Sequence, residues 1–224
     1  MSATVPGANL TRTAVRITAR GIAHRYAPGR GLEAVDFSVA GPGVVAITGP
    51  NGAGKSTLLR LIAGLLAVTR GTLEFEVGGV AIPSRSRRTQ VGFASPDLSF
   101  YEALSVAENL RFAAESRDGD PGTNVSSALA EVGLEGREHD RFAELSSGLK
   151  QRVRLAFAIL HRPPVLLLDE PGSHLDDRGR DVVAHLMEHQ RRVGLVLVAT
   201  NDQRELSLAD QRIELRGFGL GHSA

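Results

Sequence analysis

The chain has 224 residues, a formal net charge of +1 and no cysteine. This length suits one α/β domain, and a composition of 42% hydrophobic and 23% charged residues is ordinary for a globular protein. A balanced charge gives no electrostatic argument for a nucleic-acid partner or a lipid surface, and we expect no nucleic acid to bind. The lack of cysteine excludes disulfides, thiolate nucleophiles and zinc fingers, and it fits a reducing compartment such as the cytosol.

The apolar stretches are too short for a membrane span. The richest one, 58–68, contains Arg60 and Gly64 and falls below the roughly 18 consecutive apolar residues that a span needs. Residues 1–14 are expected to form a flexible N-terminus, because the first eleven lack the apolar centre of a signal peptide. The domain is then expected to cover 15–218, with 219–224 as a tail.

The first elements predicted along the chain are strands. Alternating apolar and polar residues at 15–20 and 32–40 predict antiparallel strands with one solvated face. A short apolar run at 44–48 leads into a glycine-rich turn, and leucines at helical spacing follow at 56–67. This order predicts a strand, a loop and a helix.

Further strands are expected at 72–77 and 90–94, and then the pattern becomes helical from about 97 to 148. Ser105 and Glu108 form a capping box, in which serine and glutamate satisfy N–H groups at the start of a helix. Residues 117–124, rich in Gly, Asp and Pro, predict a loop within this helical lobe.

The last third of the chain alternates buried strands and helices. Strands are expected at 165–168, 195–199 and 212–215, with a helix at 176–192 between the first two. Strands that alternate with helices favour a mostly parallel sheet covered on both faces. The predicted fold class is therefore α/β, with a three-layer core, an antiparallel β layer near the N-terminus and an inserted helical lobe.

The glycine-rich turn matches the phosphate-binding loop G-x-x-x-x-G-K-S between a strand and a helix. Glycines let consecutive N–H groups converge on phosphate oxygens, and the helix N-terminus adds partial positive charge. Lys55 should reach the β and γ phosphates, and Ser56 should ligate Mg²⁺. The chain has only two lysines among 26 basic residues, so a lysine here indicates a need for a compact ammonium. The expected ATP-binding residues of this loop are Gly49, Pro50, Asn51, Gly52, Ala53, Gly54, Lys55, Ser56 and Thr57.

A second acidic motif ends the apolar run 164–168. Asp169 and Glu170 follow it directly, and adjacent carboxylates at the end of a buried strand require a reason, because an unpaired buried charge costs several kcal/mol. Beside a phosphate-binding loop, Asp169 is expected to hold Mg²⁺ through water and Glu170 to polarise the attacking water. Alone, the motif would also fit a strand that ends in a solvated turn.

Leu145, Ser146, Ser147 and Gly148 resemble the signature motif of ABC ATPases, and the order of the motifs resembles that family over 15–218. Taken alone, Ser-Ser-Gly at a helix start is typical of an ordinary N-cap or an anion site. In the family this motif completes the ATP site of the opposite subunit. Leu149 stands where the family more often has glutamine, which resembles a recurrent variant.

The resemblance implies roles for two further residues. Tyr26 lies where ABC domains place an aromatic ring against adenine, although a half-buried strand aromatic would look the same. Asp176 lies in a segment that resembles the loop through which ABC domains sense each other across the dimer. Asp176 could also simply cap the following helix, and both roles can hold together.

Two positions depart from the family pattern. Pro96 stands where a Mg²⁺-contacting glutamine is usual, and proline has no side-chain donor or acceptor. Asn201 stands where a histidine normally touches the γ-phosphate, and asparagine donates a hydrogen bond but does not titrate. His174 lies nearby in the sequence, but a lone histidine is more often an ordinary loop residue than a substitute.

The resemblance implies an ATPase that binds MgATP and works as one half of a dimer, with a second copy or a paralogue. A separate membrane subunit would dock near 96–104, hold the chain at the cytoplasmic face and use turnover to move a solute. The compact length and the Ala-Thr-Asn-Asp sequence at 199–202 look similar to haem-exporter-like subunits of cytochrome c maturation. A soluble regulatory or assembly ATPase stays open as an alternative, as does a weakly hydrolysing half-site beside an active paralogue.

Overall fold

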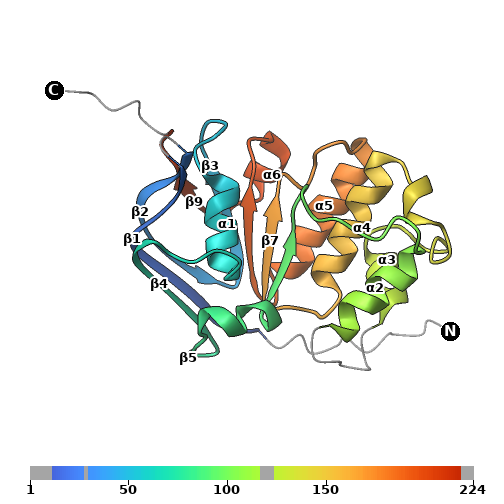
Figure 1. Ribbon diagram of the computed structural model, residues 1–224, viewed down its shortest axis with the longest axis horizontal. Coiled ribbons are helices and arrows are strands. Elements are labelled where there is room, and N and C mark those ends of the chain that lie inside the picture. The colour runs from blue at the N-terminus through green and yellow to red at the C-terminus, as the bar shows by residue number, and fades with distance from the viewer. Residues whose placement is uncertain (1–11, 28–29, 117–123, 218–224) are drawn as a thin grey trace, which may run out of the picture.

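The computed structural model of the chain describes residues 12–27, 30–116 and 124–217 (Figure 1). The expected tail, most of the expected N-terminal segment and most of the expected loop at 117–124 lie outside these residues. The elements follow in chain order: β1 (Val15–Ala27), β2 (Arg30–Gly41), β3 (Gly43–Thr48), α1 (Lys55–Ala63), β4 (Arg70–Val77), β5 (Val80–Ala81), the 3₁₀ helix η1 (Ser84–Thr89), β6 (Val91–Ala94), α2 (Val106–Glu115), α3 (Val125–Glu131), the 3₁₀ helix η2 (Phe142–Glu144), α4 (Ser147–Ile159), β7 (Val165–Asp169), α5 (Asp177–Gln190), β8 (Leu195–Ala199), α6 (Gln203–Ser207) and β9 (Gln211–Glu214).

The antiparallel layer is a four-stranded sheet in the order β2-β1-β4-β5. Its central strand, β1, pairs antiparallel with β2 and β4, so that Ile17 lies opposite Val39 and Phe75. These three side chains are buried. On β1, the residues directly before and after Ile17 are exposed and half-buried. The period-two pattern in the sequence therefore gives this sheet one buried and one solvated face, as predicted.

The parallel layer is a five-stranded sheet in the order β6-β7-β8-β3-β9. Its central strands are buried along their whole length, and successive residues face opposite sides of the sheet. Val45 and Leu167 belong to the core shared with α1 and the antiparallel sheet, whereas Ala46 and Leu168 belong to the core shared with the helical lobe. The near-continuous apolar runs of these strands follow from burial on both faces.

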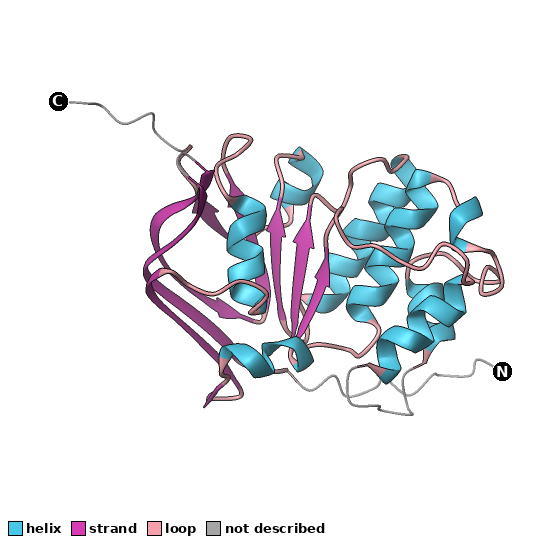
Figure 2. Ribbon diagram, viewed as in Figure 1, coloured by secondary structure: helices cyan, strands magenta, loops and turns pink. Residues whose placement is uncertain are grey.

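Helix α1 lies between the two sheets, α4 and α5 cover the other face of the parallel sheet, and α2 and α3 pack against α4 (Figures 1 and 2). The predicted helix at 56–67 is shorter in the structure, because Gly64 adopts φ 76° and ends it at Ala63. The buried Arg87 of η1 donates to the carbonyl oxygens of Leu61 and Ile62 in the last turn of α1. This cation adds hydrogen bonds to carbonyls in the last turn of the helix, where the regular pattern ends.

The helical lobe contains α2, α3 and the start of α4. The predicted capping box is present, with Ser105 accepting from Glu108 N and the Glu108 carboxylate accepting from Ser105 N. The predicted α/β fold class, with its three layers, N-terminal antiparallel sheet and helical lobe, is confirmed by the structure and its relatives. In the described part of the chain, no helix is long and apolar enough to cross a membrane.

Candidate functional site

The phosphate-binding loop lies between β3 and α1, at the carboxyl edge of the parallel sheet. Lys55 begins α1, and its ammonium donates to the carbonyl oxygens of Gly49 (2.9 Å) and Pro50 (3.4 Å), so the loop curls around it. Gly54 adopts φ 97°, and a Cβ there would lie 2.9 Å from the Leu32 side chain. Residue 54 therefore has to be glycine. Without a side chain at this position, the backbone of the loop can stay close to Lys55.

A cavity of about 450 Å³ opens in front of this loop. Its walls come from the loop and α1, from the antiparallel sheet through Tyr26 and Gly31, and from the end of β7 through Glu170. Tyr26 is about half exposed and meets His24 edge to face, so one face of its ring remains accessible. The structure thus brings the predicted adenine-stacking, phosphate-binding and water-polarising residues to one cavity. Its lining residues are Tyr26, Gly31, Asn51, Gly52, Gly54, Lys55, Ser56, Thr57, Arg60 and Glu170.

Asp169 lies on the last position of β7, beside α1. Its carboxyl group is buried, and the side chain of Ser56 is near enough to favour its charged form, so the two predicted Mg²⁺ ligands lie close together. Burial raises the pKa of Asp169, and the carboxylate of Glu170 adds to this effect, while the Ser56 side chain opposes it. A carboxylate desolvated in this way gains from a bound cation.

Arg60 is a cavity residue that the sequence analysis did not assign. It lies one helical turn after Ser56 on the same face of α1, a spacing that could have revealed it. Its guanidinium pairs with Asp97, which directly follows Pro96 in the loop after β6. Pro96 is exposed and supplies no polar side-chain atom. The loop after β6 contacts the nucleotide cavity through Asp97, which pairs with Arg60.

Glu170 directly follows β7 and has an unusual backbone, with φ 46°. Its N–H donates to the carbonyl oxygen of Ala199 (2.9 Å), and its carboxylate lies 3.5 Å from the hydroxyl of Ser173. A left-handed backbone at a non-glycine residue is strained and persists where the surroundings hold it. Here the neighbouring strand β8 and the turn that follows fix the carboxylate at the cavity wall.

A second, polar cavity of about 270 Å³ lies on the other side of Glu170. Asn201, Asp202 and Thr200 reach it from the end of β8, and His174 reaches it from the loop after Glu170. Asn201 is exposed and lines this second cavity together with Glu170, and it is not among the described residues that line the first cavity.

The signature-like segment lies at the start of α4. Ser146 is the N-cap and accepts from Leu149 N (3.3 Å), and Leu145 is buried beneath it. The capping alternative therefore holds for Ser146, while Ser147 stays exposed and Gly148 half-buried. In the described part of the chain, none of these residues lines the cavity of the chain's own phosphate-binding loop.

Asp176 caps α5. Its carboxylate accepts from Gly179 N (2.8 Å) and lies 3.6 Å from the guanidinium of Arg152 in α4. The capping role considered for this residue is present, and its role in sensing a second subunit stays a prediction. The contact joins the start of α5 to the helix that carries the signature-like motif.

The donor atoms of the first cavity fit a magnesium nucleotide. A hydroxyl and a carboxylate are hard oxygen ligands of the kind that Mg²⁺ takes, together with phosphate oxygens and water. In the part of the chain that the structure describes, no group of three or more His, Asp or Glu side chains could hold a metal ion. Ser56 and Asp169 would therefore hold Mg²⁺ together with ATP, while Lys55 and the loop N–H groups would bind its phosphates.

Comparison with known proteins agrees with this geometry, since the model of the ABC transporter family matches residues 32–173. The chain belongs to the ABC transporter family. It is an ATP-binding and ATP-hydrolysing subunit of that family, as the family match and its curated relatives show.

The curated relatives include proteins named for cytochrome c biogenesis. The chain is 37% identical over 183 residues to the cytochrome c biogenesis ATP-binding export protein CcmA of Rhodopseudomonas palustris (strain BisB5), covering 81% of this chain and 90% of that protein. It is 36% identical over 190 residues to the protein of the same name from Brucella melitensis, covering 84% and 85%. The resemblance to haem-exporter-like ABC subunits is thereby confirmed.

Solved ABC structures share the fold. The ATP-binding subunit of an ABC transporter superposes with a TM-score of 0.76 at 28% identity, covering 90% of this chain and 87% of that one. A dimeric post-hydrolysis ATP-binding cassette with ADP and phosphate superposes with a TM-score of 0.78 at 22% identity, covering 89% and 94%. At this identity the second structure supports the ABC fold alone.

Proposed function

We propose that this chain drives an exporter of the cytochrome c biogenesis kind, as one half of a head-to-tail dimer that sandwiches two MgATP. The observation that carries the proposal is the single cavity that joins Lys55, Ser56 and Glu170, from α1 and from the end of β7. Lys55 binds the β and γ phosphates, Ser56 and Asp169 hold Mg²⁺, and Glu170 accepts the proton of the attacking water or orients it.

The partner subunit completes the site through its signature motif. Ser146, Ser147 and Gly148 stand at the N-terminus of α4, and the two serine side chains are exposed, so both can reach a second molecule. A helix N-terminus with free N–H groups and hydroxyls attracts phosphate. In the dimer these residues bind the γ-phosphate held by the other chain, and Asp176 lies next to the same interface.

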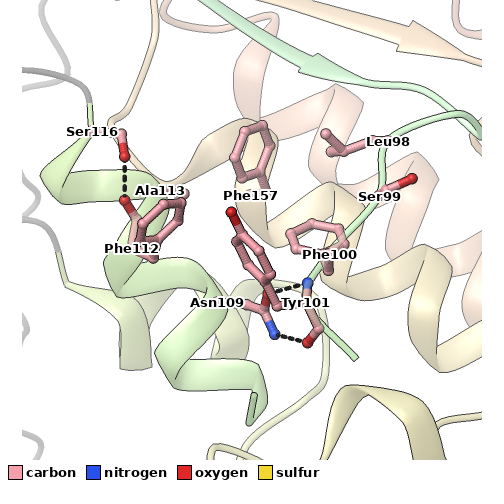
Figure 3. A pocket seen from close by; sticks show the side chains of 9 residues that line it. All are labelled: Leu98, Ser99, Phe100, Tyr101, Asn109, Phe112, Ala113, Ser116 and Phe157. Atoms are coloured by element: carbon pink, nitrogen blue, oxygen red, sulfur yellow. Dashed lines mark hydrogen bonds between the residues drawn. The ribbon is translucent and has the colours of Figure 1, made fainter. Parts of the chain in front are cut away.

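An apolar groove supports docking of a membrane subunit. The groove has a volume of about 480 Å³ and lies between the loop at 98–101, α2 and α4 (Figure 3). Tyr101 and Phe112 line it and are 57% and 51% exposed, so they add apolar area to one contiguous accessible surface. Asn109 fixes the loop by bonding both backbone groups of Tyr101, so the groove is formed in advance.

The groove includes residues 98–101 of the segment 96–104 where docking was expected, and it is connected to the loop that carries Glu170. Arg154 donates to the carbonyl oxygen of Leu98 in the groove (3.0 Å) and to the side chain of Gln151 (3.4 Å). Gln151 in turn donates to the carbonyl oxygen of Pro171, the residue after Glu170 (3.1 Å). Docking at the groove can therefore shift the loop that holds the catalytic carboxylate. The membrane subunit keeps the chain at the cytoplasmic face.

Glu170→Gln tests the site. The amide keeps the size of the side chain but loses the charge that polarises water, so hydrolysis should slow by on the order of 10² or more with ATP still bound. The variant should accumulate as an ATP-bound dimer, visible by light scattering with MgATP. Glu188→Gln is the control. Glu188 lies on α5, pairs with Arg191, and lines neither the nucleotide cavity nor the polar cavity beside Glu170. A Glu170→Gln variant that stays monomeric at high protein concentration contradicts the sandwich.

The export role requires a test in cells. In a strain of the source organism that lacks this chain, c-type cytochromes detected by haem staining should be lost, and they should return with the native chain but not with Glu170→Gln. Tyr101→Ser with Phe112→Ser should also fail to restore them while the purified subunit still hydrolyses ATP. Val80→Ser, at another exposed apolar residue, is the matched control. Normal cytochromes in the deletion strain would favour a soluble regulatory ATPase.

A further inference from the structure

Glu205 is a buried carboxylate to which the proposed mechanism gives no role. It lies in α6, the short helix that follows β8 and Asn201, and only 6% of its surface is exposed. One oxygen, Oε1, accepts from the backbone N–H of Gly172 (3.0 Å). The other, Oε2, makes no hydrogen bond within the described residues. Burying a carboxylate in this way costs free energy, so its retention requires a reason.

The carboxylate and Gly172 fit each other closely. A Cβ at residue 172 would lie 2.6 Å from Glu205 Oε1, so the carboxylate occupies the space that a side chain there would take. Gly172 belongs to the loop that joins Glu170 to Asp176. A side chain at residue 172 would therefore have to push the carboxylate of Glu205 aside, and the backbone N–H of Gly172 is held by this single distant side chain.

The hydrogen bond connects two segments that face the same polar cavity. On one side is the loop after β7, which carries Glu170, and on the other is the segment after β8, which carries Asn201. The cation of Arg180, in α5, lies 3.9 Å from Asp202 and adds a longer contact between the segment after β8 and the helix that follows the loop. Of these contacts, the bond from Glu205 is the one made inside the protein.

We propose that Glu205 is a positioning residue for ATP hydrolysis, which holds the loop of Glu170 in register with the segment of Asn201 through the N–H of Gly172. The inference rests on the proposed role of Glu170. Without this bond the loop gains freedom, and the carboxylate of Glu170 is no longer held where the attacking water must lie. The nucleotide is bound by different residues, at 49–57, so its affinity does not depend on Glu205.

The test compares steady-state kcat and KM with the affinity for a fluorescent ATP analogue. Glu205→Ala should lower kcat on the order of tenfold, since small displacements of a catalytic group have effects of this size, while KM and affinity change less than about twofold. Glu205→Gln should restore most of kcat, because the amide oxygen can still accept from Gly172. The control Glu188→Ala, which removes a glutamate outside both cavities, should leave all three values unchanged.

Gly172→Ala provides a second line of evidence. In the native chain the added methyl group displaces the carboxylate, so kcat should fall as in Glu205→Ala. In the Glu205→Ala background there is room for the methyl group, and the double variant should be no slower than Glu205→Ala alone. Two reductions that multiply independently would overturn the proposal, as would equal losses of nucleotide affinity and kcat in Glu205→Ala.

Failure of this inference and failure of the proposed function are distinguishable. If Glu170→Gln keeps the native turnover, the role of Glu170 is wrong and the inference fails with it. If Glu170→Gln abolishes turnover while Glu205→Ala leaves kcat unchanged, only the positioning role of Glu205 is wrong.

Discussion

Gln151 in α4 donates its side-chain amide to the carbonyl oxygen of Pro171, the residue that follows Glu170. The opposite end of the same strand has a matching contact, in which Gln190 of α5 donates to the carbonyl oxygen of Pro163 (2.8 Å). Both glutamines are buried, and both bond a proline carbonyl just outside β7. One contact lies beside the site and the other at the opposite end of β7.

This pair allows a controlled prediction. Gln151→Ala and Gln190→Ala each leave a buried carbonyl without its donor, so each should lower the free energy of unfolding by about 1–3 kcal/mol, measured by urea denaturation. Only Gln151→Ala should also lower the kcat of ATP hydrolysis at saturating ATP, because only Pro171 adjoins Glu170. Equal effects of both variants on kcat would show that Gln151 acts through stability alone.

Lys55→Ala should abolish ATP binding and leave the fold intact. The ammonium is held by Gly49 and Pro50 at the mouth of the loop and is the cation nearest to the expected phosphates. Titration of a fluorescent ATP analogue into the folded variant measures the loss, and circular dichroism checks the fold. Lys150→Ala, at the chain's other lysine, should bind with native affinity, because Lys150 does not line the nucleotide cavity. Unchanged affinity in Lys55→Ala would refute the phosphate-loop assignment.

Asn201 should limit the rate of hydrolysis. A histidine here would donate to the γ-phosphate and carry charge near its ordinary pKa of about 6.5, whereas asparagine donates without titrating. Asn201→His should raise kcat and introduce a pH dependence near neutrality, and Asn201→Ala should lower kcat, since a hydrogen bond to a charged group contributes about 1.5–3 kcal/mol. If Asn201→Ala leaves the rate of ATP hydrolysis unchanged while Glu170→Gln abolishes hydrolysis, Asn201 has no role in the reaction and is only a residue that follows β8.

The stability of the chain should respond to pH in opposite ways through two glutamates. Burial raises the pKa of Glu205, so the folded chain binds more protons than the unfolded chain as pH rises above the ordinary value of 4.5. Stability is therefore lost through that window, and Glu205→Gln should gain more free energy of unfolding over the native chain at neutral pH than at pH 4.5. Equal gains at both pH values would contradict this effect of burial.

Glu108 provides the contrast. Hydrogen bonds from Ser105 lower the pKa of Glu108, so its contribution to stability is present above the ordinary value of 4.5 and is lost as pH falls below it. The penalty of Glu108→Gln should therefore shrink on acidification, in urea denaturation at matched ionic strength. A penalty independent of pH would show that the charged capping box adds nothing over a neutral one.

The phosphate-binding loop and the acidic strand end could be predicted because each is a contiguous motif with its own local geometry. The strand at 195–199 was predicted with the bounds that the structure has, since an apolar run buried on both faces ends where polar residues begin. The end of α1 was placed too late, because the leucines at 65 and 66 continue the helical pattern beyond the left-handed Gly64.

The supporting contacts could not be predicted from local patterns. Glu205 bonds a backbone group 33 residues away, and Gln151 bonds one 20 residues away. Local helix and strand patterns relate residues only a few positions apart, so they do not reveal these pairs. A polar side chain needs a hydrogen-bond partner if it is buried. Here each partner is a main-chain atom, and because every residue has such atoms, the sequence does not show which one is used. Only the folded arrangement of β7, β8 and the helices around them identifies it.

The position of β3 sets the order in which the molecule can be completed. Its two neighbours in the sheet are β8 and β9, which come from residues 195–214, whereas the antiparallel strands β1, β2 and β4 all lie before residue 78. On the ribosome the antiparallel sheet can pair while β3 and the leucine-rich α1 still lack the rest of the parallel sheet that completes their burial. The phosphate-binding loop is therefore synthesised early but reaches its final conformation only after β8 and β9 have been made. Nucleotide should then stabilise only those nascent chains that already contain these two strands.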